Sequence, residues 1–267
     1  MNTRMISSAA RTSAWRSIVG GAILLAAGPL VIAGAANTGA AAGAQTSHAA
    51  SFPKGHYAQL DSLPDWGGVW TLGFARPPPG PLLKGKYLQH YQQWSSFVKA
   101  HHGEAPHSGS YCRPPGMPTI MMVHQYPIEF LFTPGRVTIN SEAWMQRRVI
   151  FTDGRGHPPD LDPTFNGDSV GNWQGDTLVV ETVGLKPVVQ IANGMEHSDR
   201  LRIVERIHLA RNDPDTLLDE MTLYDPLALQ QPWSTTLSYK RSRDEQLLEF
   251  VCEENDLNSG GSDSAIQ

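Results

Sequence analysis

One stretch of the sequence, TDGRGHPPDLDPTFNGDSVG at 152–171, gathers the side chains best suited to chemistry: Asp153, Asp160, Asp162, Asp168 and His157. Four carboxylates could supply oxygen ligands to calcium, but an EF-hand loop needs D-x-[DN]-x-[DN]-G and a glutamate at its twelfth position. The stretch lacks that spacing, and its prolines stiffen backbone that would have to wrap around an ion. Asp–Gly pairs also favour turns. We therefore predict a stiff connector, which would place His157 and Asp162 at the rim of the fold.

A zinc or iron site would need two or three convergent His, Asp or Glu ligands. The candidates come from separate loops: His157, Asp162, His197 and Asp199. No H-x-H, H-E-x-x-H or H-x-x-x-H spacing joins them, so no metal is predicted. The sequence also lacks G-x-G-x-x-G and a P-loop, and no cofactor is predicted.

Acid–base catalysis remains open, because it needs only a titratable group beside an electrostatic partner. His157 or His197 could be the acid–base group, with Asp162, Asp199 or Glu142 as the orienting or second group. A serine hydrolase is poorly supported. Ser169 in GDSVG lacks the strand–elbow–helix context that such a nucleophile requires.

Several charged residues interrupt β-forming runs, and in a barrel one face of each strand points inward. Glu142 shares a face with Asn140 and Trp144, and Glu205 falls on an otherwise apolar face, so both are predicted to point inward. Arg206 has the opposite parity to Glu205. Inward charges must be paired or must meet a ligand. The predicted ligand-binding residues are Trp144, Arg147, Glu205, Arg206, Asp199 and Tyr239.

The elements that would position these residues are mainly strands. Period-two alternation or β-rich composition predicts strands at 64–74, 128–133, 136–144, 147–153, 176–185, 200–211, 215–225, 233–242 and 245–252. One helix is predicted at 87–102, with an aromatic stripe that would pack against the sheet. Short turns between sequential strands favour an antiparallel up-and-down β-barrel of about eight to ten strands. GGVW at 67–70 resembles the G-x-W that opens many lipocalins, so the barrel is predicted to be lipocalin-like, or calycin-like.

The N-terminal region differs from the rest of the chain. Arg4, Arg11 and Arg16 precede an apolar run at 18–34 and small-residue cleavage sites, which predicts a Sec-type signal peptide over 1–44. A retained membrane anchor is the alternative, since the run approaches spanning length. We expect a flexible lead-in at 45–63, one barrel domain at 64–256 and a disordered tail at 257–267. The mature protein is expected in the periplasm or secreted.

Cleavage would leave 18 Lys and Arg against 26 Asp and Glu, a net charge of about −8, which argues against nucleic-acid binding. After cleavage no membrane partner is expected either. In an exported protein the two cysteines, Cys112 and Cys252, predict a disulfide. Two separate buried thiols are the alternative.

Motifs along the chain resemble a family of exported bacterial proteins from sphingomonads and acidobacteria. They are PDWGGVW, CRPPGMP, YPIEFLFTPGRVTINSE, RRVIFTDGRGHPPDLDPTFNGDSVGNWQGDTLVVETVGL, HSDRLRIVERIHL, DPLALQQPW and FVCEEN. They occur in order and span most of 64–255. The resemblance implies export and implies no substrate. Relatives have G-H-S and, a few residues later, an arginine before a tryptophan. At these positions this chain has Gly167-Asp168-Ser169, with Asp168 in place of the histidine, and Asn172 in place of the arginine.

Two functional hypotheses follow. The first is a barrel that binds a small, partly apolar molecule, aromatic or terpenoid-like, in its cavity; the tryptophans and the strand pattern favour it. The second is a cofactor-free lyase, isomerase or hydrolase that uses the same barrel for acid–base catalysis on such a molecule.

Overall fold

The computed structural model describes residues 57–74, 79–103 and 113–251. The predicted signal peptide, most of the lead-in, both cysteines of the predicted disulfide and the predicted tail lie outside these residues. Among the described residues, no helix is long and apolar enough to cross a membrane.

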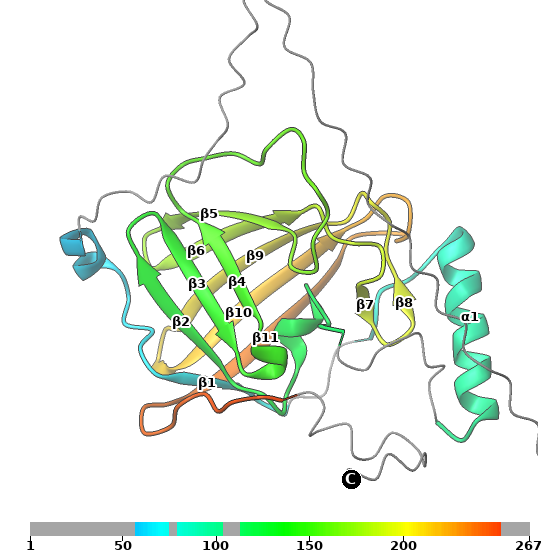
Figure 1. Cartoon of the computed structure of the whole chain (residues 1–267), viewed down its shortest axis with the longest axis horizontal. Coiled ribbons are helices and arrows are strands. Elements are labelled where there is room, and N and C mark those ends of the chain that lie inside the picture. The colour runs from blue at the N-terminus through cyan, green and yellow to red at the C-terminus, as the bar shows by residue number, and fades with distance from the viewer. Residues whose placement is uncertain (1–56, 75–78, 104–112, 252–267) are drawn as a thin grey trace, which may run out of the picture. The chain divides into compact units, whose positions relative to one another are not determined.

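Nine strands close into a barrel, which confirms the predicted mainly β fold (Figure 1). Around the barrel each strand is hydrogen-bonded to the next in the order β1-β11-β10-β9-β6-β5-β4-β3-β2, and β2 returns to β1. Their bounds are β1 Val69–Leu72, β2 Ile128–Thr133, β3 Arg136–Ser141, β4 Arg147–Phe151, β5 Asp168–Gln174, β6 Thr177–Val183, β9 Arg202–Ala210, β10 Asp213–Tyr224 and β11 Trp233–Ser242.

One junction departs from the expected antiparallel pattern. β4 and β5 run parallel and are paired at only two positions, Ile150 with Ser169 and Phe151 with Val170. The connector 152–167 makes this possible, because it carries the chain back before β5 begins, as a parallel pair requires. By contrast, β9 and β10 are paired at nine positions. The β4–β5 junction is therefore a short seam in the barrel wall.

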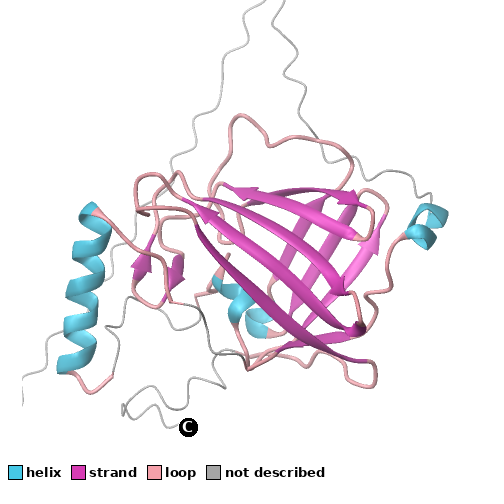
Figure 2. Ribbon diagram, turned by 180° about the vertical axis from the view of Figure 1, so that it is seen from behind, coloured by secondary structure: helices cyan, strands magenta, loops and turns pink. Residues whose placement is uncertain are grey.

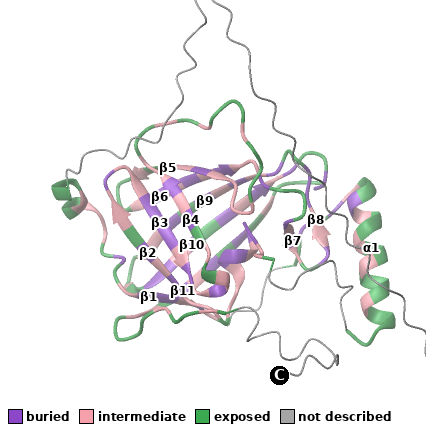
Figure 3. Ribbon diagram, in the orientation of Figure 1, coloured by how far each residue is buried: buried purple, intermediate pink, exposed green. Residues whose placement is uncertain are grey.

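Alternation along the strands separates an apolar interior from a polar exterior. In β9, Ile203, Glu205 and Ile207 are buried, and the residues between them are partly or fully exposed. Figure 3 shows this alternation as buried stretches along the strands. Rings of Trp66, Phe130, Phe132 and Trp173 pack against one another, with centroids 5.1–5.5 Å apart. The interior is thus largely filled by side chains.

Two elements sit outside the barrel wall. β7 Gln190–Ala192 and β8 Met195–Glu196 form a small hairpin between β6 and β9. The predicted helix is present as α1 Gly85–Ala100 and lies beside that hairpin (Figures 1 and 2). Its Trp94 packs on the backbone of Gly194, where an added Cβ would come within 2.2 Å of the ring. The aromatic stripe therefore meets the hairpin, and of its residues only Tyr87 is buried.

Three short 3-10 helices, η1 Tyr57–Ser62, η2 Thr119–Met122 and η3 Ala143–Met145, complete the described elements. η2 contributes Ile120 and Met121 to the core, and the Tyr239 hydroxyl donates a hydrogen bond to the Met121 carbonyl. The strand predicted at 245–252 is wrong: 245–251 has no regular structure. The described chain there has no neighbouring strand with which to pair.

Candidate functional site

A buried ionic cluster lies inside the barrel. The guanidinium of Arg148 donates two hydrogen bonds to the carboxylate of Glu205, from Nη1 at 2.8 Å and from Nη2 at 2.5 Å. It also donates to the hydroxyls of Ser169 and Thr182. Arg148 thus reaches from β4 past β5 and β6 to β9. Burial alone would lower the pKa of Arg148, but the charge of Glu205 reverses that effect and raises it.

Asp219 is the second buried acid of this cluster. Its side chain is fully buried, and neither carboxylate oxygen has a hydrogen-bond partner among the described residues. Burial raises the pKa of Asp219 well above its usual value, and the negative charge of Glu205 adds to the increase. The raised pKa favours the neutral, protonated form of Asp219. Burial likewise raises the pKa of Tyr239, which faces the same cluster.

A small cavity adjoins the cluster, with a volume of about 10 Å³. Its walls include Arg148, Ser141 and Gln146 together with side chains of η2. Ser141 Oγ and Gln146 Oε1 are buried without a hydrogen-bond partner in the described part of the chain. A cavity of this size accommodates about one water molecule and no organic ligand.

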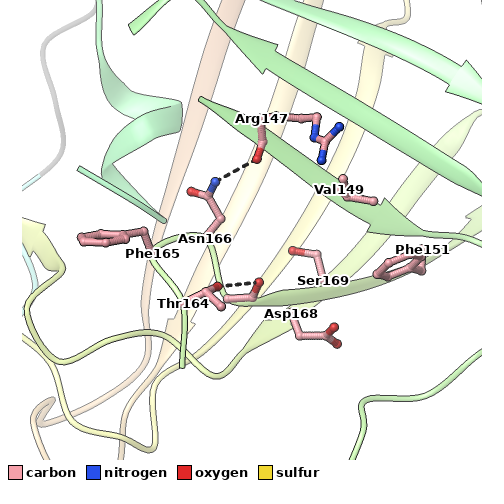
Figure 4. A pocket seen from close by; sticks show the side chains of 9 residues that line it. Arg147, Val149, Phe151, Thr164, Phe165, Asn166, Asp168 and Ser169 are labelled. Atoms are coloured by element: carbon pink, nitrogen blue, oxygen red, sulfur yellow. Dashed lines mark hydrogen bonds between the residues drawn. The ribbon is translucent and has the colours of Figure 1, made fainter. Parts of the chain in front are cut away.

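A larger groove of about 320 Å³ lies along the β4–β5 seam (Figure 4). One wall is the outward face of β4, with Arg147, Val149 and Phe151. The opposite wall is the end of the connector and the start of β5, with Thr164, Phe165, Asn166, Gly167, Asp168 and Ser169. The lining combines apolar side chains with polar groups, as ligand sites commonly do.

The connector wall is held in place by hydrogen bonds. The amide of Asn166 donates to the Arg147 carbonyl at 3.1 Å, and its oxygen accepts from Gln146 Nε2 at 3.2 Å. Gly167 has a φ of +67°, and a Cβ there would lie 2.5 Å from the Val183 carbonyl oxygen, so the turn into β5 requires glycine. These contacts hold the connector wall against β4 and β6.

His157 contacts Asp168, a residue of the groove wall. Its Nδ1 is 2.6 Å from Asp168 Oδ1, and its Nε2 is 3.5 Å from Glu181 Oε1. Glu181 in turn accepts a hydrogen bond from Arg202 at 2.8 Å. The imidazole is therefore fixed between two carboxylates, one of which lines the groove.

His197 occupies a different environment. Its ring is buried, with Nδ1 2.6 Å from the Ser198 carbonyl and Nε2 without a partner among the described residues. The neighbouring Asp225 accepts hydrogen bonds from the amide and hydroxyl of Ser198 at 2.7 and 2.6 Å. No hydrogen bond or ion pair in the described chain joins His197 to His157 or Asp162. His157 and His197, the two alternative acid–base candidates, therefore lie in separate hydrogen-bonding environments.

The inward orientation predicted for Glu142 is wrong. β3 ends at Ser141, and Glu142 begins the short helix η3, so strand alternation no longer applies to it. Its carboxylate instead accepts a hydrogen bond from the Leu248 amide at 2.7 Å. Trp144, in η3, adopts a φ of +54° and packs near Tyr126.

The remaining predicted residues fall in three places. Glu205 and Tyr239 face the buried cluster, and Arg147 lines the groove. Asp162, Asp199 and Arg206 are exposed. Arg206 lies on the outer face, 3.9 Å from Glu220.

The sequence interpretation missed Asp219 and the connector wall of the groove. Asp219 shares its strand face with Leu217, Met221 and Leu223, so the alternation that identified Glu205 would also have identified it. Asn166 and Phe165 carried no such signal, because their positions depend on the tertiary path of the connector.

Among the described residues, no group of three or more His, Cys, Asp or Glu side chains could hold a metal ion. A scan of protein-family models finds no match to the chain, and no curated protein matches it.

Proposed function

We propose that the protein binds a small, partly apolar molecule in the groove along the β4–β5 seam. The observation that carries this proposal is a groove of about 320 Å³ lined by both rings and charged groups. This volume lies at the lower end of the usual range for small-molecule sites. The cavity beside Arg148, at about 10 Å³, is far too small for the same ligand.

A screen of single-ring compounds, read by ligand-observed NMR and by backbone amide shifts, tests the proposal. Compounds that bind should shift amides of Val149 and Asn166, because these residues line opposite walls. Val149→Trp should fill the groove and weaken such binding at least about tenfold, since the ligand would lose most of its contact area.

Val179→Trp is the matched control, because Val179 lies on the outer face of β6 and does not line the groove. It should leave binding unchanged. A screen without a compound that shifts groove amides, or equal losses in both variants, would contradict the proposal.

A second candidate function is acid–base catalysis at the same groove. It is favoured by the 2.6 Å contact between His157 and Asp168, which places an oriented imidazole behind a groove-lining carboxylate. With a turned-over compound in hand, His157→Gln should lower the rate about 10²–10⁴-fold. Asp162→Asn, which changes an exposed residue of the connector, should leave the rate unchanged. Unchanged turnover in His157→Gln excludes this function.

We further propose that the chain is exported and that Cys112 and Cys252 then form a disulfide. The basic, apolar and small-residue order of 1–44 supports export, and the even cysteine pair supports the bond. Intact-mass measurement of periplasmic material after alkylation tests both. A full-length mass contradicts cleavage, and two alkylated thiols contradict the disulfide.

A further inference from the structure

We propose that the molecule bound in the β4–β5 groove is an organic anion, an apolar ring bearing a carboxylate, and that Arg147 sets this preference. The inference rests on the proposed function, because it names the ligand class of the same groove. Its basis is the charge distribution around the groove walls.

Arg147 presents a guanidinium that has no side-chain partner in the described part of the chain. No ion pair or side-chain hydrogen bond engages it within the described residues, whereas the adjacent Arg148 is fully engaged in the interior. Arg147 is exposed on the outward face of β4 and lines the groove. A free guanidinium can bind a carboxylate through two parallel hydrogen bonds.

Two further cations stand over the aromatic walls. Lys186 Nζ lies 5.0 Å from the centroid of the Phe165 ring, and the Arg155 guanidinium lies 4.0 Å from that of Phe151. Arg155 is neutralised by its ion pair with Asp153, but no ion pair involves Lys186 among the described residues. Arg147 therefore adds positive charge to the groove wall, and Lys186 adds positive charge at the Phe165 ring.

The one acidic side chain in the groove wall, Asp168, is held away from Arg147. Its Oδ1 lies 2.6 Å from His157 Nδ1, which fixes the position of the carboxylate. Figure 4 draws the Arg147 guanidinium and the Asp168 carboxylate at opposite sides of the groove. An anionic group at the Arg147 side would thus be separated from Asp168 by the apolar part of the ligand.

The apolar part has its own partners. Val149 and Phe151 provide hydrocarbon and ring surface in the β4 wall (Figure 4). A single aromatic ring packed on these two side chains would let its carboxylate reach Arg147. This arrangement distinguishes an aromatic carboxylate from a purely inorganic anion, which would gain nothing from the rings.

Cinnamate and cinnamamide provide a matched pair of probes, with the same ring and nearly the same size but with and without the charge. Titrations of the full chain should show cinnamate binding about two- to fivefold more tightly than cinnamamide, the range expected for an exposed ion pair. Arg147→Gln should remove this preference. Arg206→Gln, which alters an exposed arginine that does not line the groove, should retain it.

Salt provides a second measurement that needs no variant. Raising ionic strength from about 0.01 M to about 1 M shortens the screening length tenfold, so the preference should shrink while cinnamamide binding persists. Equal affinities in the wild type, or a preference that survives Arg147→Gln, would overturn the anion assignment while leaving groove binding intact. Failure of both probes to shift groove amides would instead count against the groove as a binding site.

Discussion

Replacing Asp219 by asparagine should change how the stability of the barrel depends on pH. The side chain is fully buried, has no hydrogen-bond partner among the described residues, and shares the interior with the carboxylate of Glu205. Burial and that neighbouring charge raise the pKa of Asp219 well above 3.8, its ordinary value. Asparagine keeps the shape of the neutral acid but cannot ionise.

The sign of the effect follows from proton binding. Between pH 3.8 and the raised pKa, the folded protein holds a proton on Asp219 that the unfolded chain has released. The contribution of Asp219 is therefore fully present below the unfolded pKa and is lost as pH rises toward the folded pKa. Over that window the loss amounts to about 1.4 kcal/mol per pH unit.

Urea unfolding, followed by the fluorescence of the buried Trp66 and Trp70, can measure this loss. From about pH 4.5 to about pH 5.5, the free energy of unfolding of the wild type should fall relative to Asp219→Asn, by at most about 1.4 kcal/mol, the limit set by one proton per pH unit. Subtracting the free energy of unfolding of the variant from that of the wild type at each pH removes the contribution of the other carboxyl groups, which both proteins share. Asp162→Asn is the control, because Asp162 is exposed and should follow the wild type.

A constant difference between wild type and Asp219→Asn across this interval would refute the reasoning. It would mean that Asp219 is already ionised in the folded protein. In that case the single positive charge of Arg148 would face two negative charges in the interior, those of Glu205 and Asp219. The carboxylate of Asp219 would then be charged without a hydrogen-bond partner among the described residues.

Arg148→Met should lower the free energy of unfolding by about 3–5 kcal/mol, because Glu205 would be left buried without its partner. Adding Glu205→Gln should restore part of the loss in urea unfolding; no restoration would contradict the pairing. Gly194→Ala should loosen α1 by forcing a Cβ to within 2.2 Å of Trp94. Unchanged amide exchange in α1 would contradict that contact. Burial alone would raise the pKa of Asp225, but hydrogen bonds from neighbouring groups lower it. Its contribution is therefore present above about pH 3.8 and lost on further acidification, so Asp225→Asn should flatten the acid limb of the stability profile. Profiles of equal slope would be the contrary result.

The barrel itself could be predicted from the sequence because most of its strands alternate clearly. β9 is the clearest case: its alternation identified the buried Glu205. β5 was missed, since Gly171 and Asn172 weaken its β propensity and it follows a connector rich in turn residues. Glu142 was misassigned because the sequence does not mark where β3 ends.

The candidate groove was harder to predict. Arg147 was identified as a ligand-binding candidate, but the wall opposite it depends on how the connector folds back to place Phe165 and Asn166. That path is determined by contacts far apart in sequence, such as the hydrogen bond from the Met117 amide to the Phe165 carbonyl. Strand periodicity contains no information about such contacts.

The way the barrel closes also determines when it can form during synthesis. β1 pairs with β11, with Val69 opposite Ser242, so the first strand finds its final neighbour only after almost the whole barrel sequence has been made. Until then β10 and β1 each have an open edge, and open edges invite pairing with other chains. Contacts this distant in sequence also slow folding. A nascent chain of this protein should therefore be most prone to aggregation just before β11 emerges, and least prone once that strand joins the two edges.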